Sequence, residues 1–213
     1  MYVDIACGYA VGSKSCGYDP SAVVTRGDVI VVTINYRLNI FGFLCTGDEN
    51  APGNYGLLDQ QLALQWVHDN IESFGGDPTR VTLFGQSAGG ASVTLHLFAN
   101  KSRSLFQRAA AHSGYFHPSV YASGRGEWLG KRARDIGEEA GCGSGSTNSE
   151  LVQCLRERPM EDVLAAGQAR IIDLKLYLSP QLTGLGIAKR WRPLVDVQPS
   201  SRSGFLFMVI ITL

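Results

Sequence analysis

The chain has 213 residues, of which 45% are hydrophobic and 18% charged, and its formal net charge is zero. This composition is typical of a soluble globular protein and excludes a disordered one. Because the sequence has neither a basic block nor an apolar run of about 20 residues, we expect no nucleic-acid partner, no binding to an anionic membrane surface and no membrane span.

Two segments precede the central motif of the chain. The β-branched run 28–34 has the pattern of a strand buried on both faces of a mostly parallel sheet. From Gly56 to Ile71 the apolar residues recur at helical spacing, and Gly75 and Gly76 supply the end of this helix. Its predicted apolar stripe contains Leu57, Leu64, Val67 and Ile71, with Leu58, Leu62 and Trp66 beside them. We expect Trp66 to fill the core, in preference to serving as a platform for substrate, because it lies on this stripe.

Residues 85–89 read Gly-Gln-Ser-Ala-Gly, a G-x-S-x-G pentapeptide centred on Ser87. A short run of strand formers precedes it, and a segment with helical character follows it. This strand, glycine-flanked turn and helix distinguish a nucleophile elbow from a βα turn without chemistry. A helix that opens at Ala88 directs backbone N–H groups, and the positive end of its dipole, toward charge that develops near the serine. The pattern therefore predicts Ser87 as a nucleophile.

After the elbow helix, residues 106–113 are predicted to return to the sheet, and Gly114 ends that strand. Further helices are predicted at 127–140, 149–158 and 160–166, with Pro159 separating the last two. Strands that alternate with helices indicate an α/β fold with a parallel sheet. The sequence contains no internal repeat, no low-complexity tract and no evident domain boundary.

Longer motifs surround the elbow. They are Asn-Tyr-Arg-Leu at 35–38, Gly-Phe-Leu at 42–44, Ala-Pro-Gly-Asn-Tyr-Gly-Leu-Leu-Asp-Gln at 51–60 and Phe-Gly-Gly-Asp-Pro at 74–78. With these motifs the chain resembles the type-B carboxylesterase family, which includes cholinesterases, bile-salt-activated lipases and insect esterases. The resemblance implies an α/β-hydrolase fold, hydrolysis of small-molecule carboxylic esters through an acyl-enzyme intermediate, and no cofactor. At Asn39 the family usually has glycine, and we expect asparagine to keep the left-handed turn.

The resemblance also assigns the donors of the oxyanion hole. Family members carry a His/Tyr-Gly-Gly-Gly/Ala-Phe/Tyr run whose N–H groups bind the oxyanion together with the N–H of the residue after the serine. The matching stretch here is 5–9, in which Ala6 and Cys7 replace glycines. Gly8 and Ala88 are therefore the candidate donors. Cys7 is a doubtful donor and a poor second nucleophile, because no histidine is positioned to activate it.

Two cysteines match a disulfide that many secreted members of the family have. Cys142 and Cys154 occupy the matching places, and the alternative is two unpaired buried thiols. Asn100-Lys101-Ser102 is an N-glycosylation sequon, which is consistent with a secretory route. We therefore expect the parent protein to be secreted, although the chain shows no signal peptide. We assign no role to Cys16 and Cys45, and we make no prediction about the oligomeric state.

The rest of the catalytic triad is not evident. In α/β-hydrolases the acid and then the histidine follow the serine, and none of the four histidines has the sequence context of the family's base. We expect them to be surface or locally hydrogen-bonded residues: His68, His96, His112 and His117. Residues 191–196 resemble the segment before the catalytic glutamate, and the resemblance then stops. We expect residues 1–196 to be a partial α/β-hydrolase domain that lacks the opening strands and the C-terminal half, and 197–213 to be a divergent tail. A frameshift, a retained intron and a mispredicted exon boundary all remain open as its origin.

Three functions are compatible with these features. The first is a serine carboxylesterase lineage in which this chain is inactive alone, because the acid and the histidine are missing. The second is a non-catalytic, neuroligin-like adhesion or binding protein, which the retained Ser87 disfavours because those relatives typically lose the serine. The third is a truncated product with no function of its own. Gln86 replaces the glutamate of cholinesterases, so a neutral side chain favours general or hydrophobic esters over choline esters.

Overall fold

The computed structural model describes residues 2–3, 9, 19–114, 126–143, 145–169 and 207–212. The chain divides into two compact units. The first, the sheet unit, is drawn from residues 1–36, 57–116 and 183–213. The second, the helical unit, is drawn from residues 37–56 and 117–182. Among the described helices, none combines the length and apolarity that crossing a bilayer requires.

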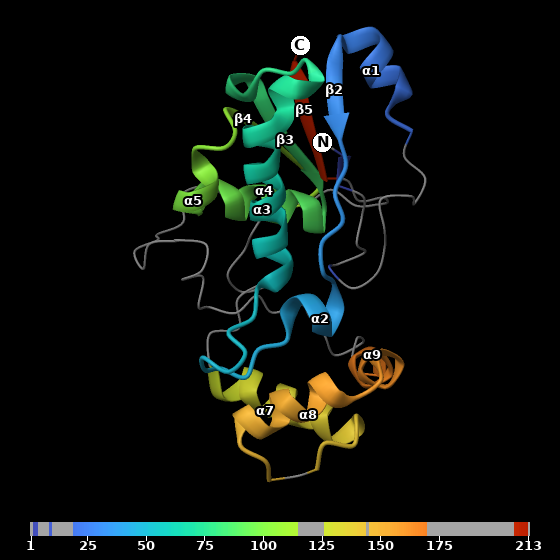
Figure 1. The fold of residues 1–213 in the computed structure, drawn as a ribbon, viewed down its shortest axis with the longest axis vertical. Coiled ribbons are helices and arrows are strands. Elements are labelled where there is room, and N and C mark those ends of the chain that lie inside the picture. Colours follow the sequence, from blue (N-terminus) through green and yellow to red (C-terminus); the bar gives the residue numbers. More distant parts are fainter. Residues whose placement is uncertain are drawn as a thin grey trace. The chain divides into compact units, whose positions relative to one another are not determined.

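The sheet unit is built on five described strands (Figure 1). They are β1 (Tyr2–Val3), β2 (Val29–Val32), β3 (Val81–Gln86), β4 (Arg108–His112) and β5 (Phe207–Thr212). β3 and β4 pair in parallel, whereas β1, β2 and β3 each pair antiparallel with β5. The first four strands therefore run in one direction and β5 in the other. β5 falls within the segment that we expected to diverge, and it lies between β2 and β3.

The described helices of the sheet unit pack against the sheet or against one another. They are α1 (Ser21–Gly27), α3 (Tyr55–Asn70), α4 (Ala88–Phe98) and α5 (Asn100–Arg103), with 3-10 turns η1 (Ile71–Phe74) and η2 (Pro78–Arg80). Residues of α3, α4 and β3 share one apolar core. The four residues of the stripe predicted from the sequence, Leu57, Leu64, Val67 and Ile71, are all buried. The core contains Leu64, Val67, Ile71, Val81, Leu83, Val93, Leu105 and Phe106. The prediction of an α/β fold is confirmed.

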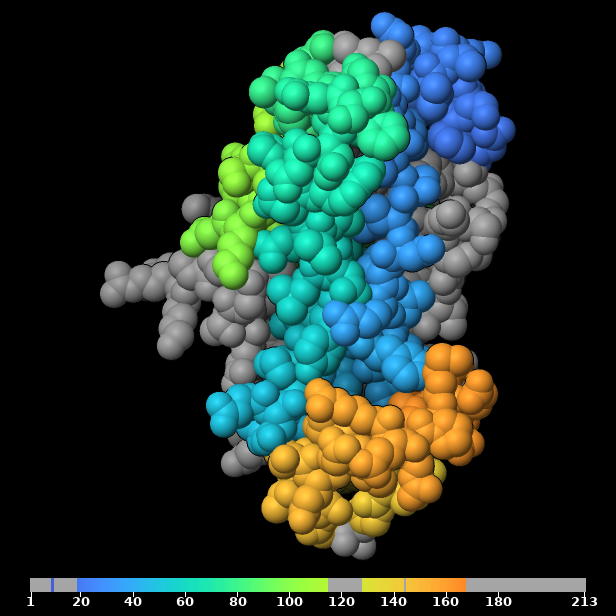
Figure 2. Space-filling model, viewed as in Figure 1, coloured from blue at the N-terminus to red at the C-terminus, as the bar shows by residue number. Residues whose placement is uncertain are grey.

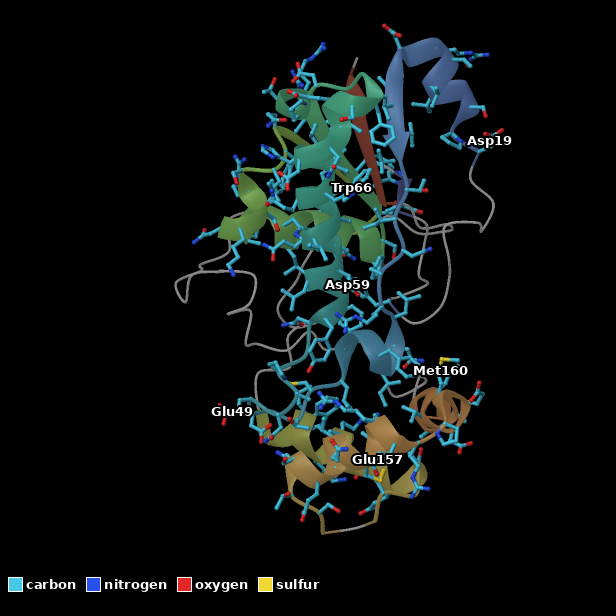
Figure 3. All side chains as sticks on the ribbon, viewed as in Figure 1. Asp19, Glu49, Asp59, Trp66, Glu157 and Met160 are labelled. Carbon is cyan, nitrogen blue, oxygen red and sulfur yellow. A yellow bond between two sulfur atoms is a disulfide. The ribbon has the colours of Figure 1, made fainter. Side chains whose placement is uncertain are left out.

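The prediction for Trp66 is wrong. This side chain is 48% exposed on α3 (Figure 3), and its ring packs against the exposed ring of Phe74 at a centroid distance of 5.8 Å. Trp66 is one residue from the fully buried Val67, and one residue turns a helix by about 100°. The buried side chains of α3 span an angle around the helix axis that is smaller than this rotation. Trp66 and the 70% exposed Leu62 therefore lie outside the core.

The turn between α3 and β3 forms as the sequence predicts. Gly75 has a left-handed backbone with φ 82°, and its N–H donates to the carbonyl of Glu72. Asp77 then accepts a hydrogen bond from the N–H of Thr79 at 2.7 Å and caps η2. These two local interactions end η1 and begin η2, and they direct the chain from α3 into the elbow strand.

The helical unit contains α2 (Asn39–Phe43), α7 (Gly126–Glu139), α8 (Asn148–Glu157) and α9 (Met160–Ala169). Thr147 and Glu150 form a capping box at the start of α8. The predicted disulfide between Cys142 and Cys154 is confirmed, and it joins the segment after α7 to α8. Asn39 has φ 51°, so the predicted left-handed turn is also confirmed.

A buried polar network holds α4 against α3 and α5. His96 of α4 is fully buried, and its Nδ1 and Nε2 lie 2.9 Å from Ser102 Oγ and 3.0 Å from Gln60 Oε1. Because Gln60 Oε1 accepts, Nε2 carries the proton and Nδ1 accepts from the Ser102 hydroxyl. Burial lowers the pKa of His96 to about 4. The imidazole is therefore neutral in the folded chain at pH 7.

We predict that His96 makes the sheet unit sensitive to acid. Its pKa is lower in the folded state than the ordinary 6.5, so below pH 6.5 the unfolded chain binds a proton that the folded chain does not. Stability falls as the pH drops, by about 3 kcal/mol between pH 7 and pH 4. Denaturant titrations at several pH values give the free energies of unfolding of wild type and of His96→Gln. The difference between these two free energies should shrink by this amount as the pH falls from 7 to 4. The exposed His68→Gln is the control, and an acid dependence that His96→Gln leaves unchanged would contradict the prediction.

Candidate active site

The predicted strand, turn and helix around the G-x-S-x-G motif are confirmed. β3 ends at Gln86, α4 begins at Ala88, and Ser87 between them has φ 50° and ψ −115°. A serine at positive φ is strained, and such strain often marks a functional site. Two hydrogen bonds hold it: the Ser87 N–H donates to the His112 carbonyl at 2.8 Å, and the Ser87 carbonyl accepts from the Ala91 N–H at 2.8 Å. The turn is therefore fixed from both β4 and α4.

Two glycines outside the pentapeptide allow the backbone to approach this turn closely. A Cβ atom on Gly114 would overlap the carbonyl of Ser87, and one on Gly90 would lie 2.6 Å from the carbonyl oxygen of Gly114. The segment that follows β4 thus packs directly on the elbow. From the sequence alone, Gly114 is expected only to end a strand. Its contact with Ser87 depends on the pairing of β3 with β4, and a short sequence pattern does not show which strands are neighbours.

The surroundings of Ser87 favour negative charge. Ser87 is partly exposed, and its side chain makes no capping hydrogen bond to α4. Ala88 is the first residue of this helix and is 2% exposed. The first N–H groups of a helix have no partner within the helix, and they carry the positive end of its dipole. A helix of eleven residues that begins next to the serine is thus suited to stabilise an oxyanion there.

The second candidate donor, Gly8, lies outside the described residues, as do Cys7 and Cys16. Tyr9, which follows Gly8 in the sequence, is fully buried, and its hydroxyl lies 2.8 Å from Ser92 Oγ on α4. This hydrogen bond ties the chain next to Gly8 to the elbow helix. Cys45 is buried in the helical unit, where its thiol lies 3.6 Å from the carbonyl of Pro52.

The described histidines are engaged away from the serine hydroxyl. His68 is exposed, with Nδ1 3.1 Å from Asp69, and both ring nitrogens of His96 are bound in the buried network. His112 ends the exposed strand β4 and contacts Ser87 through its backbone carbonyl. Within the described ranges, no hydrogen bond joins Ser87 to an imidazole. The expected surface position is confirmed for His68 and His112, which are exposed, whereas His96 is hydrogen-bonded within the core and His117 lies outside the described residues.

The chain is similar to several characterised esterases. It is 46% identical over 159 residues to cholinesterase 1 of Branchiostoma lanceolatum, a stretch that covers 74% of this chain and 44% of that protein. It is 47% identical over 140 residues to human bile salt-activated lipase, covering 65% of this chain and 18% of the lipase. It is 57% identical over 107 residues to juvenile hormone esterase of Tribolium castaneum, covering 50% and 18% of the two chains. The chain thus spans less than half the length of these relatives.

A comparison with protein families matches residues 5–206 to the carboxylesterase family. The match includes the elbow, the buried network behind it and most of the helical unit. It agrees with the α/β fold and with the geometry at Ser87. The chain therefore belongs to the carboxylesterase family.

Proposed function

We propose that this chain supplies the nucleophile and the oxyanion donors of a serine carboxylesterase. Ser87 Oγ attacks the carbonyl carbon of a small-molecule ester and gives up its proton to a base. The Oγ–C bond forms, the bond from that carbon to the alcohol oxygen breaks, and the acyl group stays on the serine until water removes it. The observation that carries this proposal is the strained backbone of Ser87 at the start of α4.

In this proposal the N–H groups of Ala88 and Gly8 bind the oxyanion. The position of Ala88 as the first residue of α4 supports the first assignment. The hydrogen bond between Tyr9 and Ser92 supports the second, because it anchors the residue after Gly8 on the same helix. Each donor of this kind is worth about 10²- to 10³-fold in kcat.

The strain at Ser87 favours catalysis over a binding role without chemistry. Positive φ at a non-glycine residue costs of order 1–3 kcal/mol. An esterase needs the serine hydroxyl that such a turn presents, and this need accounts for the cost. The substrate class that we propose is general or hydrophobic esters, because the buried Gln86 next to the serine is uncharged.

We further propose that the parent protein follows the secretory route. The disulfide between Cys142 and Cys154 supports this, since such bonds persist in oxidising compartments and are rare in the cytosol. The bridge lies in the core of the helical unit, where Cys142 is 7% exposed.

In the full-length protein we expect a fluorophosphonate probe to label Ser87. The hydroxyl lies beside the N–H groups that would stabilise the tetrahedral adduct. Peptide mapping of the labelled protein locates the adduct. Ser87→Ala should abolish it, and Ser104→Ala, which replaces an exposed serine away from the elbow, should leave it unchanged. Labelling that survives Ser87→Ala, or that maps to Cys7, would remove the assignment.

We expect the 213-residue chain alone to show little ester hydrolysis. His68 and His96 are held by other partners, and none of the four histidines has the sequence context of the family's base, so we expect the serine hydroxyl to stay protonated. Loss of a triad member lowers kcat by roughly 10⁴-fold or more. The assay compares hydrolysis of p-nitrophenyl acetate by the purified monomeric chain and by its Ser87→Ala variant. A Ser87-dependent rate near that of ordinary esterases would show that one of the four histidines acts as the base.

Gly114→Ala should weaken the elbow without touching the nucleophile. The added Cβ overlaps the Ser87 carbonyl, so the turn must move. A displacement of about 1 Å at a reacting group costs about 100-fold in rate. In the full-length protein we expect fluorophosphonate labelling to slow by that factor. Gly27→Ala is the matched control, because its Cβ would meet only Val29 at an ordinary 3.5 Å. Equal labelling rates in the two variants would contradict the proposed contact.

A further inference from the structure

We propose that Asn100 carries an N-linked glycan and that the glycan is attached before the sheet unit folds. The inference rests on the secretory route proposed above. Asn100-Lys101-Ser102 is the single N-x-S/T sequence among the 213 residues. The structure places its first and third residues in opposite environments, the one in solvent and the other in the core.

The acceptor residue is accessible. Asn100 is the first residue of α5, and both it and Lys101 are exposed. This part of the chain, in light green, lies at the surface of the molecule (Figure 2). A glycan on its amide nitrogen would extend into solvent without displacing any part of the sheet unit. The folded structure therefore tolerates the modification.

The third residue of the sequon is not accessible after folding. Ser102 is fully buried, and its hydroxyl donates to Nδ1 of His96 at 2.9 Å. The sequon requires a hydroxyl residue at this position, so the enzyme that transfers the glycan must reach it. In the folded chain this hydroxyl is committed to the imidazole in the core. Transfer must therefore precede the formation of the Ser102–His96 hydrogen bond.

The transfer itself needs a lipid-pyrophosphate-linked oligosaccharide as donor. The bond from the anomeric carbon to the pyrophosphate oxygen breaks, and a bond from that carbon to Asn100 Nδ2 forms. The amide loses one proton, and the lipid pyrophosphate leaves with the bonding electron pair. The same serine hydroxyl is thus used twice: first as part of the recognition sequence, and then as the hydrogen-bond donor to His96.

A glycan at Asn100 also has a physical use. Leu97 and Phe98, which end α4 just before the sequon, are 37% and 42% exposed. Exposed apolar groups of this kind promote association. A hydrated oligosaccharide that starts two residues later would cover them. We therefore expect the unglycosylated protein to associate more readily than the glycosylated one.

The modification is tested on the full-length protein expressed in a eukaryotic host. Treatment with peptide N-glycosidase converts a glycosylated asparagine to aspartate, so the peptide with Asn100 should appear with aspartate only after treatment. Asn100→Gln should lose the glycan and keep its stability, whereas Ser102→Ala should lose the glycan and also be less stable. Lys101→Arg keeps the sequon and should keep the glycan. The state of Cys142 and Cys154 is read from the same digest.

Two results would overturn the modification. Unmodified Asn100 in secreted protein with an intact Cys142–Cys154 bridge would refute the glycan alone and leave the secretory route standing. Unmodified Asn100 together with two free thiols would refute the route and the glycan together.

The order of events is tested separately. Folded, unglycosylated protein from a bacterial host is incubated with microsomal membranes and the lipid-linked donor, next to a peptide that spans residues 96–106. We expect the peptide to be modified and the folded protein to remain unmodified. Modification of the folded protein at the rate of the peptide would refute the proposed order.

Discussion

The site depends on one constraint, which is the backbone of Ser87 at positive φ. This conformation costs of order 1–3 kcal/mol and persists only where neighbouring structure holds it. Here the carbonyl of His112 binds the Ser87 N–H, the Ala91 N–H binds the Ser87 carbonyl, and Gly114 leaves room for both. The pairing of β3 with β4 brings His112 to that place. The sheet and the elbow helix are therefore both necessary for the geometry of a single residue.

The elbow helix is held in turn by buried side chains that hydrogen-bond to it. His96 connects α4 to Gln60 of α3 and Ser102 of α5, and Ser92 connects it to Tyr9. Apolar packing of Val93 and Leu95 allows small shifts along the helix, whereas a hydrogen bond of 2.8–3.0 Å does not. Networks of this kind select one arrangement of a core, because a slip would leave donors and acceptors without partners. The hydrogen bonds of Ser92 and His96 therefore fix the position of α4, and with it the position of Ser87 at the start of this helix.

Local patterns predicted the elements of the fold, because periodicity and turn residues act over a few positions. The elbow, the turn at Gly75 after α3 and the helices around Pro159 are all of this kind. Two features depend on distant residues and could not be predicted in that way. β5 pairs with β2, some 180 residues earlier in the chain, and Gly114 meets Ser87 only because β3 and β4 are neighbours. Trp66 was misplaced for a third reason: helical spacing gives a stripe, but its width is set by what packs against it.

The formation of the elbow and the placement of a catalytic base depend on different residues. The residues that contact the Ser87 backbone all lie in the contiguous stretch from β3 to Gly114. A base requires an imidazole that is brought to the serine and left available for it. His96, the histidine on the elbow helix, is instead neutral, buried and bound at both nitrogens, so it stabilises the helix and is unable to take the proton of Ser87. The elbow therefore identifies the lineage of this chain, whereas ester hydrolysis would also require an imidazole that is available to Ser87.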